Sequence, residues 1–234
     1  MRLHRFMGDF KLKEGNLKIT DKELLNQFRS VLKLKIGERI ILCDGNINEG
    51  TAEIKGYNKG TVDIEILDIV KNENEPDRAV VLYCAILKKE NFELVVQKAT
   101  EIGVSEMVPL ITARTIKLDI RKDRLQKIIK EAAEQSGRGI VPVLHGPVDF
   151  EDAVKNVSKD GTNLFFDISG QNLDPHTTYY TLHTTIWTGP EGGWTETELE
   201  AAKNVGFNVI SLGKTTLRAE TAAIIGSYLA IHSF

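Results

Sequence analysis

Two glycine-rich segments near the C-terminus hold the residues best suited to chemistry. They are Thr188-Gly-Pro-Glu-Gly-Gly-Trp194 and Ser211-Leu-Gly-Lys-Thr-Thr-Leu-Arg-Ala-Glu-Thr221. Each lies between a strand-like run and a helical one. Glycine has no Cβ and tolerates positive φ, so such turns bring backbone N–H and C=O groups close to a ligand. We predict that both turns line one pocket; the alternative is that each is only a tight turn.

Two nucleotide-binding motifs fail on these segments. Gly213-Lys-Thr215 resembles the end of a P-loop, but Asn208 stands where that motif requires its first glycine. The first segment does not fit the dinucleotide fingerprint GxGxxG. Glu191 occupies the position of the second glycine, and Pro190 removes a backbone donor. Another nucleotide-using α/β enzyme is therefore a weakened alternative.

Together the two segments closely resemble the signature of the SPOUT class of S-adenosylmethionine (SAM)-dependent RNA methyltransferases. Within that class the chain is similar to the bacterial family that methylates N3 of a uridine in small-subunit (16S) ribosomal RNA. The resemblance covers nearly the whole chain. Its further matches are Lys98-Ala-Thr-Glu-Ile-Gly-Val104, Ala113-Arg-Thr115, Glu131-Ala-Ala-Glu-Gln-Ser-Gly-Arg138 and His4-Arg-Phe6.

This resemblance implies a fold, a cofactor and partners. It implies a PUA-like β-barrel that binds RNA over residues 1–72 and an α/β SPOUT-like methyltransferase domain over residues 73–234. A C-terminal trefoil knot, in which residues 184–218 are threaded, enters by the resemblance alone, because knots are rare in proteins. The implied cofactor is SAM, without a metal, and the implied partners are 16S ribosomal RNA or the small ribosomal subunit and a second copy of the chain.

Methyl transfer from a sulfonium is an in-line displacement, so the enzyme must bind SAM, aim its methyl group and exclude water. Uridine N3 becomes nucleophilic only as its proton leaves, and a cation near the flanking carbonyl oxygens stabilises the resulting charge. Arg218, which opens the last helix, is the candidate catalytic cation; alternatively it pairs with Glu220 or Glu191. Glu220 is the candidate base, with capping or pairing at the helix N-terminus as the alternative.

The other site residues are assigned to cofactor or RNA. The cofactor-binding residues are Thr188, Gly189, Gly192, Gly193, Leu212, Gly213 and Leu217. The RNA-binding residues are Arg5, Arg114 and Arg138. For Arg114 and Arg138 the alternative is a solvated or ion-paired side chain. The chain departs from the family's usual pattern at Lys214-Thr-Thr216, where a Pro-Arg-Ile-like segment is commoner, and at Lys33, which replaces an arginine and lacks its planar fork.

The composition of the chain limits its number of domains, its location and the chemistry of its cysteines. The 234 residues are 41% hydrophobic and 27% charged, enough for one large or two small domains, and the net charge of −3 by itself does not point to nucleic acid. Residues 1–72 are slightly basic, with 13 Lys and Arg against 11 Asp and Glu. No apolar run reaches the ~18 residues of a membrane span, so we expect a cytoplasmic protein. Cys43 and Cys84 lie in strand-like runs, which favours burial over disulfide or metal chemistry.

The elements that position these residues are predicted from the hydrophobic pattern. A polar stretch from Lys71 to Arg78 is typical of a linker. Before it, Ile40–Cys43 and the alternating run Thr61–Ile66 predict strands, and a short helix is expected from Lys22 to Leu34. These elements predict the small β-barrel of the first domain.

After the linker, strands and helices alternate, which predicts a largely parallel sheet. Strands are expected at residues 80–87, 107–111, 163–167, 184–188 and 207–212. Helices are expected after the first two strands, the second stopping at Gly137, and Thr195-Glu-Thr-Glu198 is a capping box that begins another. Both glycine segments then fall at the carboxyl ends of strands, where α/β sheets bind ligands.

The last helix, from Leu217 to about His232, carries more apolar surface than packing on one side requires. Ala222, Ile225 and Leu229 form one stripe, with Ile224 and Tyr228 beside it. We expect this surface to join two subunits; the alternative is that it packs within one subunit. For the whole chain, the alternative to an RNA methyltransferase is a non-catalytic RNA-binding or ribosome-assembly protein with the same domains.

Overall fold

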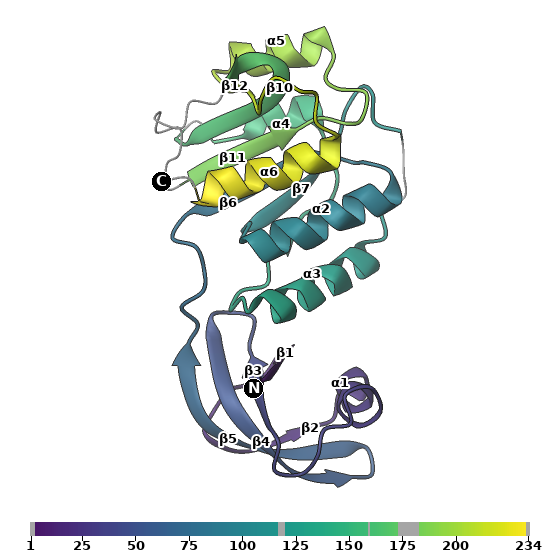
Figure 1. Ribbon diagram of the computed structural model, residues 1–234, viewed down its shortest axis with the longest axis vertical. Helices are drawn as coiled ribbons and strands as arrows, with labels where there is room; N and C mark the ends of the chain where they lie inside the picture. The colour runs from purple at the N-terminus through teal and green to yellow at the C-terminus, as the bar shows by residue number, and fades with distance from the viewer. Residues whose placement is uncertain (1–2, 117–119, 159, 173–182, 233–234) are drawn as a thin grey trace. The chain divides into compact units, whose positions relative to one another are not determined.

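The computed structural model describes residues 3–116, 120–158, 160–172 and 183–232. These residues form two compact units (Figure 1). The first comprises Met1–Glu75 and Ala133–Val141, and the second comprises Pro76–Ala132 and Pro142–Phe234. The hydrophobic pattern suggested a single boundary between residues 72 and 73. In the structure, a segment from the middle of the chain also contributes to the first unit.

Five strands form the sheet of the first unit, paired in the order β1-β3-β4-β5-β2. Their bounds are β1 (His4–Met7), β2 (Gly15–Ile19), β3 (Arg39–Cys43), β4 (Asn48–Asn58) and β5 (Thr61–Lys71). β1 and β3 are parallel, and the other pairs are antiparallel. The alternation in β5 buries Val62, Ile64 and Ile66, as a strand with one face on the core requires.

The helix expected near residue 22 is present in this unit. It consists of α1 (Lys22–Asn26) and a π-helical continuation, η1 (Gln27–Val31). It begins at Asp21, whose carboxylate accepts a hydrogen bond from the Leu24 backbone N–H at 2.8 Å. Phe28 is fully buried, and its ring centre lies 4.5 Å from that of Phe6 in β1. This aromatic contact ties the helical segment to the sheet.

The second unit contains a sheet in which every strand pair is parallel, in agreement with the predicted α/β fold. The order is β12-β10-β11-β6-β7-β8, and β9 also pairs with β7. The bounds are β6 (Ala79–Ala85), β7 (Glu106–Ile111), β8 (Val143–Leu144), β9 (Val148–Asp149), β10 (Thr162–Asn172), β11 (His183–Thr188) and β12 (Asn208–Ser211). The carboxyl ends of β10, β11 and β12 therefore meet at one edge.

Helices pack on both faces of this sheet. The described helices that follow the linker are α2 (Lys89–Ile102), α3 (Lys122–Ser136), whose last residues belong to the first unit, α4 (Phe150–Asn156), α5 (Glu196–Asn204) and α6 (Ala219–His232). α6 lies beside α2 and packs on β6 and β11, as Figure 1 shows, and α4 contacts α5 and β7. The capping box at the start of α5 is confirmed: the Glu198 carboxylate accepts from the Thr195 backbone N–H at 2.7 Å, and the Thr195 hydroxyl accepts in return.

Six elements, β1, β2, β4, β8, β9 and α4, were not predicted from the sequence. β8 and β9 contain two residues each, too few to show alternation, and α4 is a helix of seven residues. Cys43 and Cys84 are buried free thiols, as expected. Burial raises the pKa of the Cys84 thiol to about 12. Within the described part of the chain, no helix is long and apolar enough to cross a membrane.

Candidate functional site

A pocket of about 610 Å³ opens at the carboxyl ends of β11 and β12, beside the middle of β10. Both glycine segments line it, together with the first residues of α2 and α6 and residues 166–168 of β10. The structure thus brings together segments whose sequence positions extend from residue 88 to residue 222. The lining residues are Lys88, Asn91, Phe166–Ile168, Gly189–Trp194, Ser211–Gly213 and Thr215–Glu220 with Ala222.

The first loop follows β11 and is shaped by Trp194. The Trp194 indole N–H donates to the Phe166 backbone carbonyl at 3.0 Å, and the ring stacks on Phe165 with centroids 4.3 Å apart. A Cβ on Gly189 would lie 3.0 Å from the Trp194 ring, so a glycine lets the chain pass this side chain. Gly193 closes the turn by donating to the Pro190 carbonyl at 2.8 Å, and its φ of +69° favours glycine.

The second loop follows β12 and exposes backbone to the same pocket. The Ser211 hydroxyl donates to the Gly213 carbonyl at 2.8 Å, and Gly213 has a φ of +142°. Leu212 and Leu217 are half-buried and line the pocket, whereas Lys214, Thr215 and Thr216 are exposed. The loop thus offers the pocket two apolar side chains and main-chain polar groups.

Arg218 and Glu220 lie at the mouth and wall of the pocket, at the start of α6. The Arg218 side chain is 87% exposed, and that of Glu220 is only 10% exposed. Nη1 of Arg218 lies 3.9 Å from Oε1 of Glu220, too far for a hydrogen bond. The pairing alternative for Arg218 is therefore realised only as a loose ion pair, which leaves its guanidinium available to a ligand.

Thr188 was predicted to contact the cofactor, but it is not among the residues that line the pocket. It is the last residue of β11 and is 1% exposed, because it faces the interior of the unit. Its position supports the loop that comes after it. Gly189, Gly192, Gly193, Leu212, Gly213 and Leu217 all line the pocket.

Arg114, one of the arginines predicted to bind RNA, holds the first loop from outside. Its Nη1 donates to the backbone carbonyls of Gly192 at 2.6 Å and of Trp194 at 3.1 Å. Next to it, the Ala113 N–H donates to the Glu198 carboxylate at 2.9 Å, so the loop after β7 is joined to the start of α5 as well. The Arg114 side chain is exposed, and one of its three nitrogens makes both contacts.

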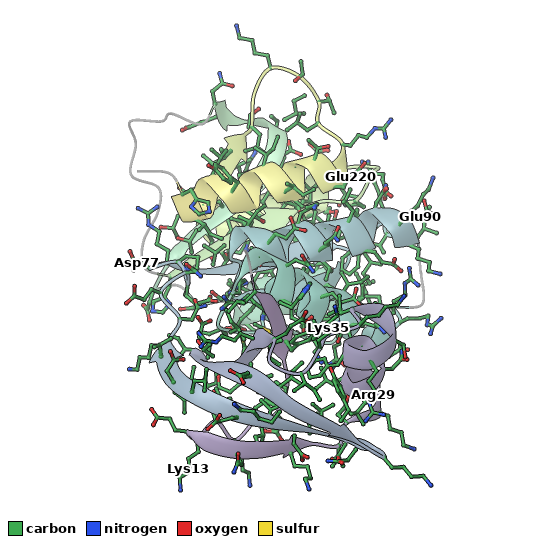
Figure 2. The ribbon with its side chains drawn as sticks, turned by 60° about the horizontal axis from the view of Figure 1, so that its bottom comes forward. Lys13, Arg29, Lys35, Asp77, Glu90 and Glu220 are labelled. Carbon is green, nitrogen blue, oxygen red and sulfur yellow. The ribbon has the colours of Figure 1, made fainter. Side chains whose placement is uncertain are left out.

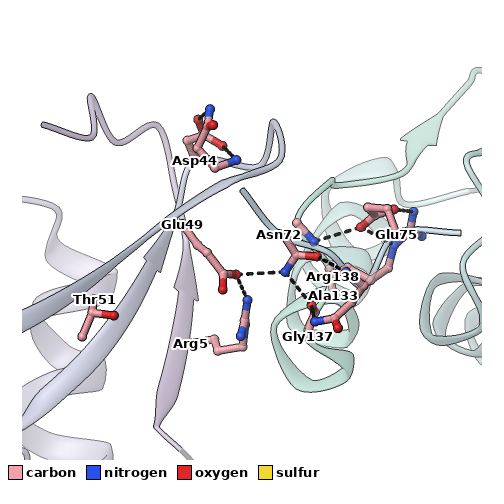
Figure 3. Close-up of polar contacts among 12 residues, drawn as sticks. Arg5, Asp44, Glu49, Thr51, Asn72, Glu75, Ala133, Gly137 and Arg138 are labelled. Atoms are coloured by element: carbon pink, nitrogen blue, oxygen red, sulfur yellow. Dashed lines mark hydrogen bonds and ion pairs between the residues drawn. The ribbon is translucent and has the colours of Figure 1, made fainter. Parts of the chain in front are cut away.

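The other two predicted RNA contacts, Arg5 and Arg138, are ion-paired within the first unit (Figure 3). Arg5 pairs with Glu49. Arg138 is 4% exposed, and its Nη2 donates to the Glu75 carboxylate at 2.8 Å. For Arg138 the structure therefore shows the ion-paired alternative. Burial alone would raise the pKa of Glu75, but hydrogen bonds from Arg138 and two backbone N–H groups outweigh it and lower that pKa.

Several pocket residues were missed by the sequence reasoning. Lys88 and Asn91 lie at the start of α2, soon after β6, and a search of the residues next to each strand's carboxyl end at this edge could have found them. Asp167, the last residue of the strand predicted at residues 163–167, also lines the pocket, although β10 extends to Asn172. Glu191 accepts a hydrogen bond from the Lys88 backbone N–H at 3.1 Å, a contact across 103 positions that no local pattern indicates. Among the described residues, no group of His, Cys, Asp and Glu side chains could hold a metal ion.

Comparison with known families identifies the kind of protein that has this site. Residues 73–230 match the family model of the RNA methyltransferase domain, which covers more than half of the chain. The chain belongs to the RNA methyltransferase family. Residues 28–67 match the PUA domain of RNA methyltransferases, so the first unit contains this family's PUA domain. Both findings agree with the predicted resemblance.

Relatives within the RNA methyltransferase family carry a more specific name. The chain is 36% identical to ribosomal RNA small subunit methyltransferase E of Mesomycoplasma hyopneumoniae, over 68% of this chain and 72% of that one. It is 32% identical to the protein of the same name from Synechocystis, over 91% and 71%.

Solved structures of similar proteins contain a cofactor. The Neisseria gonorrhoeae ribosomal RNA small subunit methyltransferase E, bound to SAM, matches 97% of this chain with a TM-score of 0.88 and 29% identity, over 95% of its own length. A Legionella pneumophila protein, also in complex with SAM, matches 98% of this chain and 97% of its own, with a TM-score of 0.86 and 29% identity.

Proposed function

We propose that this protein transfers a methyl group from SAM to N3 of a uridine in 16S ribosomal RNA. One observation carries the proposal. Two glycine loops and the start of α6 enclose a single pocket in a chain that matches SAM-bound members of its family over almost their whole length. The names of the relatives supply the class of substrate, and the resemblance noted in the sequence supplies the target atom.

The residues of the pocket suit SAM. Its volume of about 610 Å³ lies within the range of pockets that enclose cofactor-sized molecules. Leu212 and Leu217 offer apolar contacts to an adenine ring, and the backbone of the two loops offers donors and acceptors for its edges. A Cβ on Gly193 or Gly213 would meet no protein atom within 4 Å, so these glycines leave space that a ligand can fill. SAM, when bound, supplies the electrophilic methyl group.

The residues around the pocket can direct the uridine. Arg218 extends its guanidinium into solvent beside the pocket, where it can hold the carbonyl oxygens that flank N3 and stabilise their charge as the proton leaves. Two roles suit the Glu220 carboxylate: acceptance of the N3 proton, or contact with a donor of the cofactor. Arg114 positions the first loop, and burial of the aromatic side chains beneath it keeps that loop rigid.

We assign RNA binding to residues 1–72 and SAM binding and catalysis to residues 73–234. Lys13, Lys33 and Lys35 are exposed on the first unit, and Figure 2 labels Lys13 and Lys35. Exposed lysines of this kind bind phosphates through charge. Arg5 and Arg138 act there through their ion pairs, by ordering the surface, and the exposed edge of Arg114 remains open to an RNA phosphate.

We further propose that the working unit is a homodimer joined through α6, and that residues 184–218 form the trefoil knot of the SPOUT class. Two apolar side chains on α6 are exposed, Tyr228 at 56% and Ile225 at 37%. Ala222 and Leu229, on the same face, are only half-buried. A second subunit would cover this face. The chain forms β12 at the edge of the sheet, next to β10, and then returns so that α6 packs on β11 and β6. This return path is consistent with a threaded C-terminal segment.

The test is a map of modified uridines in 16S ribosomal RNA, made by mass spectrometry from cells with and without the protein. We expect one N3-methyluridine to disappear in the deletion strain and to return with the wild-type gene. The Arg218→Ala variant, expressed at the same level, should restore markedly less of it. Identical maps from both strains would contradict the proposal, and would favour a role in RNA binding or ribosome assembly without catalysis.

A further inference from the structure

Glu220 is the most unusual polar residue of the pocket. It is the second residue of α6, lines the pocket and is 7% exposed. Its Oε2 is buried and has no hydrogen-bond partner among the described residues. A buried carboxylate oxygen without a donor is costly, so this side chain is suited to a donor that comes from outside the chain.

Among the described residues, no protein group donates a hydrogen bond to Oε2 of Glu220. The nearest cation, Arg218, lies 3.9 Å from the other oxygen, Oε1, and its side chain is 87% exposed, so solvent screens the attraction. The N-terminus of α6 attracts negative charge but provides no hydrogen-bond donor to Oε2.

The other two acidic residues of the pocket are already partnered. The Asp167 carboxylate accepts from the Ser169 backbone N–H at 2.8 Å, and the Glu191 carboxylate accepts from the Lys88 N–H at 3.1 Å. With Lys88 and Arg218 as its cations, the pocket lining carries three carboxylates and two positive charges. The lining therefore favours a ligand that brings a positive charge with N–H donors to Glu220.

We propose that Glu220 binds the ammonium group at the amino-acid end of the cofactor, an inference that rests on the proposed function. SAM offers four kinds of group to a carboxylate: the ammonium, the adenine amino group, the ribose hydroxyls and the sulfonium. The sulfonium has no N–H or O–H to donate, and the neutral amino group or a hydroxyl would satisfy the oxygen while leaving its charge unpaired. Only the ammonium meets both needs, because it combines three donors with a full charge.

This assignment makes Glu220 a selectivity residue. It places a fixed negative charge in the wall of the pocket. This charge repels the phosphates of ATP and other nucleotides, and it attracts the ammonium group of an amino-acid tail. The failure of the P-loop motif in the second loop agrees with such a preference. The aminoacyl ammonium is present in both the substrate SAM and the product S-adenosylhomocysteine, so Glu220 does not distinguish between them.

Calorimetric titration with three ligands tests this proposal. SAM and S-adenosylhomocysteine carry the ammonium, whereas 5′-methylthioadenosine has the same nucleoside without the amino-acid tail. We expect Glu220→Gln, which keeps the shape and removes the charge, to weaken SAM and S-adenosylhomocysteine equally, by about ten- to hundredfold, the scale of a hydrogen bond to a charged group. The affinity for 5′-methylthioadenosine should stay within about twofold.

Glu196→Gln is the matched control, because Glu196 is an exposed acid in the first turn of α5 and does not line the pocket. It should change none of the three affinities. Weakening of SAM alone would assign Glu220 to the sulfonium, and weakening of all three ligands would assign it to the adenosine, through the adenine amino group or the ribose hydroxyls. Unchanged binding with slow methyl transfer would make it the base. Each of these results overturns the proposal, whereas the absence of SAM binding by the wild-type protein would refute the proposed function itself.

Discussion

Replacement of Gly193 gives the sharpest test of the pocket. The residue lines the pocket and has a φ of +69°. A Cβ at this position would meet no protein atom within 4 Å. A side chain there would therefore enter space left for a ligand without disturbing any neighbour, so binding and folding can be separated.

The effect on folding depends on the backbone alone. A left-handed conformation costs an ordinary L-residue about 1–2 kcal/mol, so Gly193→Ala should lower the unfolding midpoint by roughly 2–8 °C in a domain of this size. Valine, which is β-branched, should be worse. Asparagine tolerates the left-handed region, and Gly193→Asn should lower the midpoint by no more than about 2 °C.

Isothermal titration with SAM then measures the effect on the pocket. We expect Gly193→Asn to weaken SAM binding at least about tenfold, a loss of about 1.4 kcal/mol. Gly206→Asn is the control, because Gly206 has a φ of +89° and does not line the pocket, and a Cβ on it would meet no atom within 4 Å. It should bind SAM normally. A stable Gly193→Asn protein with wild-type affinity for SAM would refute the assignment of this loop.

Three further predictions concern catalysis, assembly and pH. Arg218→Ala should slow single-turnover methyl transfer by roughly ten- to a thousandfold while SAM still binds, and Arg218→Lys should restore only part of the rate. Ile225→Glu should convert dimers to folded monomers in sedimentation experiments, because this side chain is 37% exposed in a single subunit. The pKa of Glu75 is lower in the folded protein than its ordinary value of 4.5, so the ionised carboxylate stabilises the fold above pH 4.5. This stabilisation is lost as the pH falls through the folded-state pKa. Glu75→Gln should remove that acid sensitivity and, by removing the charged acceptor of the Arg138 Nη2 hydrogen bond, cost about 1.5–3 kcal/mol at neutral pH.

Each of these three predictions has a result that would contradict it. A normal single-turnover rate in Arg218→Ala would exclude the residue from the reaction. Wild-type protein that is monomeric at micromolar concentration while it methylates RNA would refute the dimer, whatever the variant does. For the ion pair, chemical denaturation of the wild type and Glu75→Gln at pH 7 and pH 4 is the measurement. Equal acid sensitivity in both proteins would mean that Glu75 does not carry the effect.

The amino-acid sequence by itself determined the class of fold in the second unit. Alternation of strand-like and helical runs specifies a parallel sheet, because each crossover helix must cover one face of it, and both glycine segments then fall at the carboxyl ends of strands. The capping box at Thr195 and the helix end before Gly137 were equally predictable. These features depend on residues within a few positions of one another, and local chemistry decides them.

Only the tertiary structure decided which partners the charged residues have. Arg114 holds the carbonyl of Gly192, 78 positions away, and Arg138 pairs with Glu75, 63 positions away. Neither pairing leaves a local sequence pattern, because an arginine that is buried and paired cannot be told from a solvated one by its neighbours in the sequence. The same limit applies to Thr188, whose burial depends on how β11 is covered.

Glu220 combines properties that the sequence determines with properties that only the tertiary structure determines. Its place in the first turn of α6 can be predicted from the sequence, and so can the helix dipole that favours its charged form. One of its oxygens is buried without a donor in the wall of a pocket, and segments from four parts of the chain form that pocket. This environment depends on the packing of β10, β11, β12 and α2. Burial and hydrogen-bond partners are properties of that packing, and they turn an ordinary helix-capping acid into a candidate binding group.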